Sequence, residues 1–80
     1  MQKSVVMTWD AQTTAEWMAR KMRASKVQEA NIDKVMRVFV DNDICGSVLF
    51  DLSDAVLKDD LDIKQFGARQ VILQILSRLY

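Results

Sequence analysis

The chain of 80 residues contains no histidine and no proline, and it has only two glycines and one cysteine. Because Cys45 is alone, the sequence excludes an internal disulfide and a cluster of thiolate ligands for zinc or an iron–sulfur centre. The absence of histidine removes the commonest general base, so we predict that the protein is not an enzyme and has no catalytic residues. The scarcity of proline and glycine favours compact helices over a strand-rich fold.

Long apolar runs are also missing. The longest runs, such as residues 38–40 and 71–73, contain three apolar residues, whereas a helix that crosses a bilayer needs about 20. Residues 1–9 lack the apolar core of a signal peptide. A lone cysteine needs no oxidising compartment. We therefore expect one soluble domain in the cytoplasm, with the nucleus as an alternative.

The formal net charge is zero, but the charges are unevenly distributed. Residues 1–40 carry seven basic and four acidic groups, residues 41–62 carry one basic and seven acidic groups, and residues 63–80 carry three basic groups and no acidic one. The middle of the chain is therefore strongly acidic and its end is basic. This arrangement could attract another copy, or a related partner, head to tail.

Apolar spacing predicts helices in the first half of the chain. Residues 1–8 have no helical period and are expected to form an extended or frayed lead-in to a domain over residues 9–80. Asp10 is the expected N-cap of a helix that runs to about residue 22, and Asn31 is the expected N-cap of a second helix that ends at residues 41–43. The apolar positions expected to face inward are Trp17, Met18, Met22, Ile32, Val35, Met36, Phe39 and Val40.

Shorter elements and a long final helix are expected in the second half. Gly46 should turn the chain into a one-turn helix around residues 47–51, and Ser53 should cap a short helix that ends near Asp60. Gly67 is expected where another segment approaches closely. The last helix should begin near residues 64–66, with one apolar face made of Ala68, Ile72, Ile75, Leu76 and Leu79.

Residues 41–46 superficially match the opening of a calcium-binding loop, with acids at the first and third positions and glycine at the sixth. The fifth position is Cys45 and the twelfth is Leu52, where a bidentate glutamate is required. We therefore expect no bound metal and no cofactor. The acids around Cys45, namely Asp41, Asp43 and Asp51, should disfavour its thiolate.

Two groups of basic residues could attract an anion. The first comprises Arg20, Lys21, Arg23 and Lys26, and is interpreted as a solvated helix end rather than a patch for nucleic acid or lipid. The second is residues 67–69, where Arg69 follows a glycine at the start of a helix. The same geometry could receive the aspartates of a partner.

Residues 9–79 resemble the sterile alpha motif (SAM) domain, and the likeness is closest to SAM domains of fungal signalling adaptors and polarity scaffolds. The resemblance implies an all-α fold, a five-helix bundle with a long C-terminal helix. The sequence departs from the pattern at Thr14, where an apolar residue is usual, at Asp62, which replaces a glycine, and in a longer connection over residues 23–33. The matching positions are Trp9, Glu16, Trp17, Met18, Phe39, Ile44, Gly46, Leu49, Leu52, Leu57, Leu61, Ile63, Gly67, Arg69, Ile72, Leu73, Leu76 and Leu79.

The resemblance implies a protein–protein interaction module in a signalling or scaffold complex that binds another SAM domain, either a second copy or a different one. Phe66 could anchor such an interface or pack in the core. The implied end-helix face comprises Lys64, Phe66, Gly67, Arg69 and Gln70. The implied mid-loop face comprises Asp41, Asp43, Asp51, Asp54, Asp59 and Asp60.

Some SAM domains bind RNA hairpins, and this is the alternative function for the basic start of the last helix. Affinity for RNA depends largely on basic groups that neutralise phosphates, so the zero net charge and the acidic middle disfavour a nucleic-acid partner. Membranes are disfavoured as well, because no strongly basic amphipathic helix is present.

Overall fold

The computed structural model describes residues 3–79, and every regular element in that range is helical. The prediction of an all-α protein is therefore confirmed. Over the described residues there are six helical segments, which are α1 (Lys3–Val6), α2 (Ala11–Ala24), α3 (Glu29–Asp41), the 3-10 helix η1 (Gly46–Asp51), the π-helical turn η2 (Val56–Asp60) and α4 (Phe66–Ser77).

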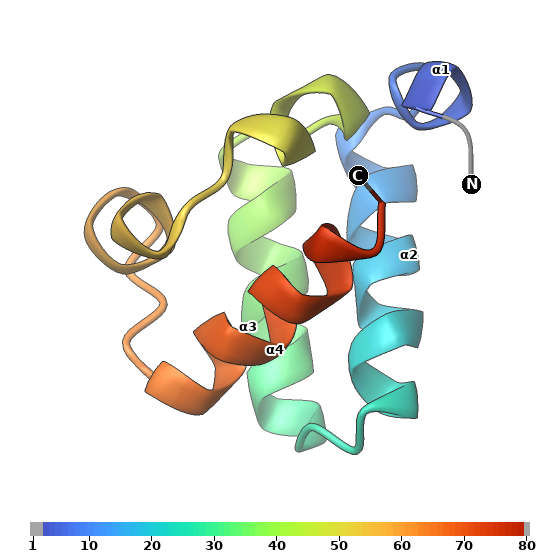
Figure 1. The fold of residues 1–80 in the computed structure, drawn as a ribbon. Helices are drawn as coiled ribbons and strands as arrows, with labels where there is room; N and C mark the ends of the chain where they lie inside the picture. The colour runs from blue at the N-terminus through green and yellow to red at the C-terminus, as the bar shows by residue number, and fades with distance from the viewer. Residues whose placement is uncertain (1–2, 80) are drawn as a thin grey trace.

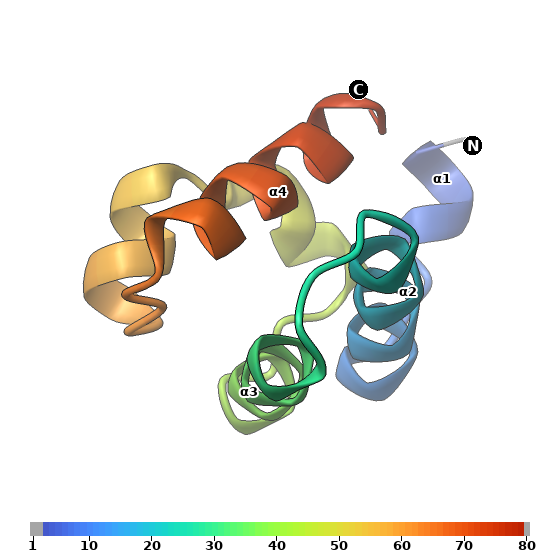
Figure 2. The ribbon, with the colours of Figure 1, turned by 90° about the horizontal axis from the view of Figure 1, so that it is seen from below.

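The long helices α2 and α3 lie side by side and run in opposite directions, and α4 crosses one side of the pair (Figures 1 and 2). The short elements η1 and η2 lead from the end of α3 to the start of α4 (Figure 1). The core lies between the α2–α3 pair, α4 and the short elements. Its largest fully buried side chains include Met18, Met22, Ile32, Phe39, Leu49, Leu57, Ile63, Ile72 and Leu76.

Helix α2 begins as predicted. The Asp10 carboxylate accepts a hydrogen bond of 2.8 Å from the backbone N–H of Thr13, as an N-cap should. The inward positions Trp17, Met18 and Met22 are all buried. Thr14, which stands where the SAM pattern has an apolar residue, is also buried, and its hydroxyl donates to the carbonyl oxygen of Asp10 at 2.8 Å. That bond makes a polar side chain tolerable in the core.

Helix α3 begins earlier than predicted. Its N-cap position is Gln28, which makes no side-chain capping bond, and Asn31 lies inside the helix. The connection from α2 is thus short, not long, because Lys26 adopts a left-handed conformation (φ 63°) that turns the chain sharply. Of the predicted inward positions of α3, Ile32, Val35 and Phe39 are buried, Met36 is half-buried, and the prediction for Val40 is wrong because 42% of this residue is exposed.

The expectation of an extended lead-in is wrong for the described part of residues 1–8. Residues 3–6 form the single-turn helix α1, and the Val6 side chain is completely buried. The segment is held against η1, since the backbone N–H of Gly46 donates to the carbonyl oxygen of Trp9 at 3.0 Å. Residues 1 and 2 lie outside the described residues.

The second half follows the predicted element order. The Ser53 hydroxyl oxygen accepts a hydrogen bond of 3.2 Å from the N–H of Val56, and the short helix ends at Asp60, as expected. Asp62 has a φ of 57°. This left-handed conformation is one that glycine adopts at no steric cost. Along α4, Ala68, Ile72, Ile75 and Leu76 are buried, and Leu79 is half-buried beyond the end of the helix. None of the described helices is long and apolar enough to cross a membrane.

The two glycines have different surroundings, and for Gly67 the expectation of a close approach is wrong. A Cβ atom on Gly46 would overlap with the carbonyl oxygen of Val6, whereas a Cβ atom on Gly67 would meet nothing within 4 Å. Gly46→Ala should therefore destabilise the protein by about 1–3 kcal/mol through overpacking. Gly67→Ala should stabilise it by about 0.5 kcal/mol, because Gly67 lies in a helix. Urea unfolding of both variants tests these two predictions, and equal free energies of unfolding for the two variants would contradict them.

The Asp10 cap should make stability depend on pH. The hydrogen bond from the Thr13 N–H holds the pKa of the Asp10 carboxyl below its ordinary value of 3.8. The ionised cap therefore stabilises the folded state above the ordinary pKa, and this contribution is lost as the pH falls through the lowered value. Asp10→Asn keeps an acceptor that does not titrate, so the Tm advantage of the wild type over this variant should shrink between about pH 6 and about pH 2.

Thermal unfolding of the two proteins across that range measures the effect. Asp10→Ala, which lacks an acceptor, serves as the control and should be the least stable of the three at neutral pH. A Tm difference between wild type and Asp10→Asn that stays constant with pH would contradict the assignment.

Candidate functional site

Arg69 occupies a different place from the one predicted. The expected end-helix face includes this residue, but only 6% of it is exposed. Its Nε donates to Oδ1 of Asp54 at 2.9 Å, and its Nη1 donates to the carbonyl oxygens of Ile63 and Lys64, each at 2.9 Å. These three bonds occupy the guanidinium within the molecule, so we remove Arg69 from the surface that could bind a partner.

The same contact changes the predicted mid-loop face. Asp54 belongs to that face by prediction, yet it is half-buried and forms the ion pair with Arg69. One residue from each predicted face is thus paired with the other inside a single molecule. A contact between two copies that uses these two side chains would first have to break this bond.

Without Arg69, the predicted end-helix face presents an exposed aromatic ring and only one lysine. Phe66 is 65% exposed, so the core interpretation of this residue is wrong. The guanidinium carbon of Arg69 lies 5.7 Å from the centre of its ring. Lys64 is exposed, and its Nζ lies 3.7 Å from Oδ1 of Asp62, so part of its charge is compensated. Gly67 is exposed and Gln70 is half-buried.

The remaining mid-loop residues are available to a partner. Five of the six predicted aspartates are exposed, and none of these five forms an ion pair within the part of the chain that the structure describes. They lie at the end of α3, in the loop that follows it, in η1 and in η2. We call this set the acidic face: Asp41, Asp43, Asp51, Asp59 and Asp60.

The electrostatic expectation for Cys45 is wrong. A hydrogen bond with the Ser47 hydroxyl, 3.2 Å from the Cys45 Sγ, and the backbone N–H of Val48 lower the pKa of the Cys45 thiol. These local donors outweigh the desolvation of the thiol, which raises its pKa. Among the described residues there is no group of three or more Cys, Asp or Glu side chains arranged to hold a metal ion.

In the basic group of Arg20, Lys21, Arg23 and Lys26, one positive charge is compensated by a carboxylate. The Nε of Arg23 donates to the Glu29 carboxylate at 2.9 Å, which joins the end of α2 to the start of α3. Arg20, Lys21 and Lys26 are exposed. No ion pair of these three is found within the described residues.

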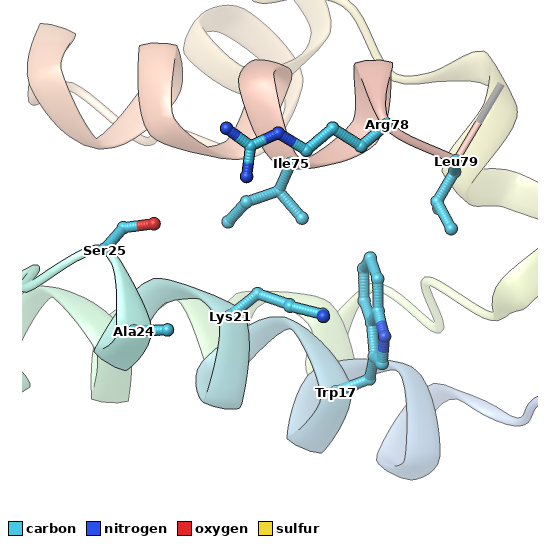
Figure 3. A pocket seen from close by; sticks show the side chains of 7 residues that line it. All are labelled: Trp17, Lys21, Ala24, Ser25, Ile75, Arg78 and Leu79. Atoms are coloured by element: carbon cyan, nitrogen blue, oxygen red, sulfur yellow. The ribbon is translucent and has the colours of Figure 1, made fainter. Parts of the chain in front are cut away.

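A cleft that the sequence patterns do not indicate lies between the C-terminal parts of α2 and α4 (Figure 3). Its volume is about 380 Å³, and it is lined by Trp17, Lys21, Ala24, Ser25, Ile75, Arg78 and Leu79. Trp17 packs against Trp9 with ring centres 5.5 Å apart, and its buried indole N–H has no hydrogen-bond partner among the described residues. Helical spacing places Trp17, Lys21 and Ala24 on one face of α2, but only the fold brings Arg78 opposite them.

No protein-family model, curated protein or solved structure matches this chain. The resemblance to SAM domains therefore stays a prediction.

The buried position of Arg69 gives a test of its structural role. Arg69→Met leaves the carbonyl groups of Ile63 and Lys64 without their donors, so it should destabilise the protein by about 2–4 kcal/mol. Asp54→Ala keeps both of those bonds and should cost about 1–2 kcal/mol. Urea unfolding measures both variants. Arg23→Met, which removes an exposed ion pair, is the matched control and should have a much smaller effect. If Arg69→Met and Arg23→Met were equally stable, the assigned role of Arg69 would be wrong.

Proposed function

We propose that the chain is a SAM-type protein–protein interaction module of a signalling or scaffold complex, without catalytic activity, that associates with a SAM domain of the same or of a different kind. In this proposal α2, α3, η1, η2 and α4 correspond to the five helices of the bundle, and α1 is an addition before it. The order of the elements is consistent with this assignment, whereas α4 (Phe66–Ser77) is no longer than α2 or α3.

The acidic face is the observation that carries the proposal. Its five exposed aspartates form no ion pair within the described part of their own molecule, although the whole chain has zero net charge. Exposed charges of one sign steer a partner of opposite charge and discriminate against others. A protein with a basic surface is the partner that these aspartates favour.

Phe66 adds a second contact surface. The Phe66 ring is 65% exposed at the first position of α4, so a partner can contact it. Aromatic side chains with neighbouring polar residues are typical anchors of protein interfaces. Phe66 and Lys64 are therefore the residues of the end-helix face that we retain.

The alternative of RNA binding loses support from the same geometry. The burial of Arg69 lowers the positive charge that is accessible at the start of α4. The pairing of Arg23 with Glu29 compensates one charge of the basic group near the end of α2. Neutralising phosphates requires free cations, and fewer of them remain than the sequence suggests. The arrangement favours a protein partner.

We predict that the protein associates with itself in a manner that depends on concentration and salt. Sedimentation velocity should show association that weakens between about 0.05 M and about 0.5 M salt, because exposed charges are screened. Asp41→Lys and Asp59→Lys should each weaken it. Glu16→Lys makes the same charge change at an exposed position of α2 outside the acidic face, and should leave it nearly unchanged. A monomer at every concentration that binds a fluorescent RNA hairpin would contradict the proposal.

A further inference from the structure

The cleft between α2 and α4 has an apolar wall. Trp17 is 4% exposed, and it faces Ile75 and Leu79 across the space between the two helices (Figure 3). A volume of about 380 Å³ is at the lower end of the range for clefts that bind ligands. The cleft can therefore take in one compact apolar group, such as a single side chain of a partner.

Two cations from different helices border this wall. Lys21 comes from α2 and Arg78 follows α4, and both reach toward the cleft (Figure 3). None of the lining residues carries a carboxylate, and neither cation forms an ion pair within the described residues. Arg23, Lys64 and Arg69, by contrast, each have a carboxylate oxygen between 2.9 and 3.7 Å away. The complementary group is an apolar side chain beside one or two carboxylates.

The acidic end of α3 has this composition. Val40 is 42% exposed and is followed by the exposed residues Asp41 and Asp43. The other large apolar residues that are clearly exposed have basic neighbours instead: Val5 and Met7 follow Lys3, and Phe66 lies near Lys64 and Arg69. Asp33 and Arg37 line the same surface as Val40. Because their charges are opposite, together they add no net charge to this surface.

The acidic end of α3 is separated from the cleft of its own molecule. Val40 and Asp41 lie beside Gln12, near the start of α2, whereas Lys21 lies near the other end of that helix. Nine residues of helix separate Gln12 and Lys21, which is about 14 Å along the axis. A contact between the two surfaces therefore requires a second molecule.

We infer that the Lys21–Arg78 cleft binds the acidic end of α3 of a second copy of this chain. Lys21 and Arg78 donate to the carboxylates of Asp41 and Asp43, and Val40 packs against the apolar wall. The inference rests on the proposed function, because it concerns self-association. It assigns the basic counterpart of Asp41 and Asp43, the part of the acidic face at the end of α3, to the cleft instead of to the start of α4. Since the two surfaces differ, each added copy leaves one of each kind free, and the contact is head to tail.

Sedimentation velocity of single variants tests the inference. Lys21→Glu, Arg78→Glu and Asp41→Lys should each weaken self-association by about tenfold or more. Arg20→Glu is the matched control, because Arg20 is an exposed cation of α2 that does not line the cleft. It should leave the association within about threefold of the wild type. Thermal unfolding followed by circular dichroism verifies that each variant is folded.

A mixture of two variants tests the pairing itself. Lys21→Glu keeps an intact acidic end and Asp41→Lys keeps an intact cleft, so an equimolar mixture should form a 1:1 dimer and no larger species. Trp17 gives a second readout. In a Trp9→Phe background, its fluorescence should change as the protein associates, and this change should be absent when Lys21→Glu is added.

Three results would overturn the inference. A wild-type chain that stays monomeric at all concentrations excludes the second copy as the occupant, while a different SAM partner would still satisfy the proposed function. Association that survives Lys21→Glu and Arg78→Glu but is lost in Phe66→Ser or Lys64→Glu places the counterpart at the start of α4, and the proposed function would stand. A mixture of Lys21→Glu and Asp41→Lys that remains monomeric shows that these two surfaces do not pair.

Discussion

The guanidinium of Arg69 connects three segments whose apolar side chains also share the core. It bonds to Asp54 at the start of the short helical region, to the carbonyl groups of Ile63 and Lys64 in the connection, and its own backbone belongs to α4. The connection contains the left-handed residue Asp62 and no regular hydrogen-bonded structure after Leu61. Buried carbonyl groups there need a donor, and an arginine supplies several in a fixed geometry.

This internal contact decides which charges remain for a partner. It buries Arg69 and pairs it with the half-buried Asp54, so the start of α4 keeps Phe66 and a partly compensated Lys64 at the surface. The five aspartates of the acidic face remain exposed, and the uncompensated cations that share a cleft are Lys21 and Arg78. The simple opposition of an acidic middle and a basic end therefore becomes, in three dimensions, an acidic end of α3 and a basic cleft between α2 and α4.

Much of the fold is predictable from the sequence because it depends on local rules. The 3.6-residue period of apolar positions located α2, α3 and α4, and Asp10 and Ser53 were recognisable as caps from residue type and position. The rest depends on contacts between distant residues. The helix at Lys3–Val6 exists because Val6 is buried in the core, and Gly46 is needed because the Val6 carbonyl approaches it. The partner of Arg69 lies fifteen residues away in the sequence. Arg78 and Lys21 line the same cleft only because α4 packs on α2. A charge count along the chain contains none of this information.

We propose that Arg69 stays bonded within its own molecule while Lys21 and Arg78 take part in association. A series of proton–nitrogen NMR spectra, recorded while the protein is diluted from an associated to a monomeric state, tests both parts together. We expect the Arg69 Nε–H signal to keep its position, whereas the amide signals around Lys21, Arg78 and residues 40–43 should shift. An Arg69 Nε–H signal that shifts or exchanges with water on dilution, beside unchanged signals around Lys21 and Arg78, would contradict this proposal.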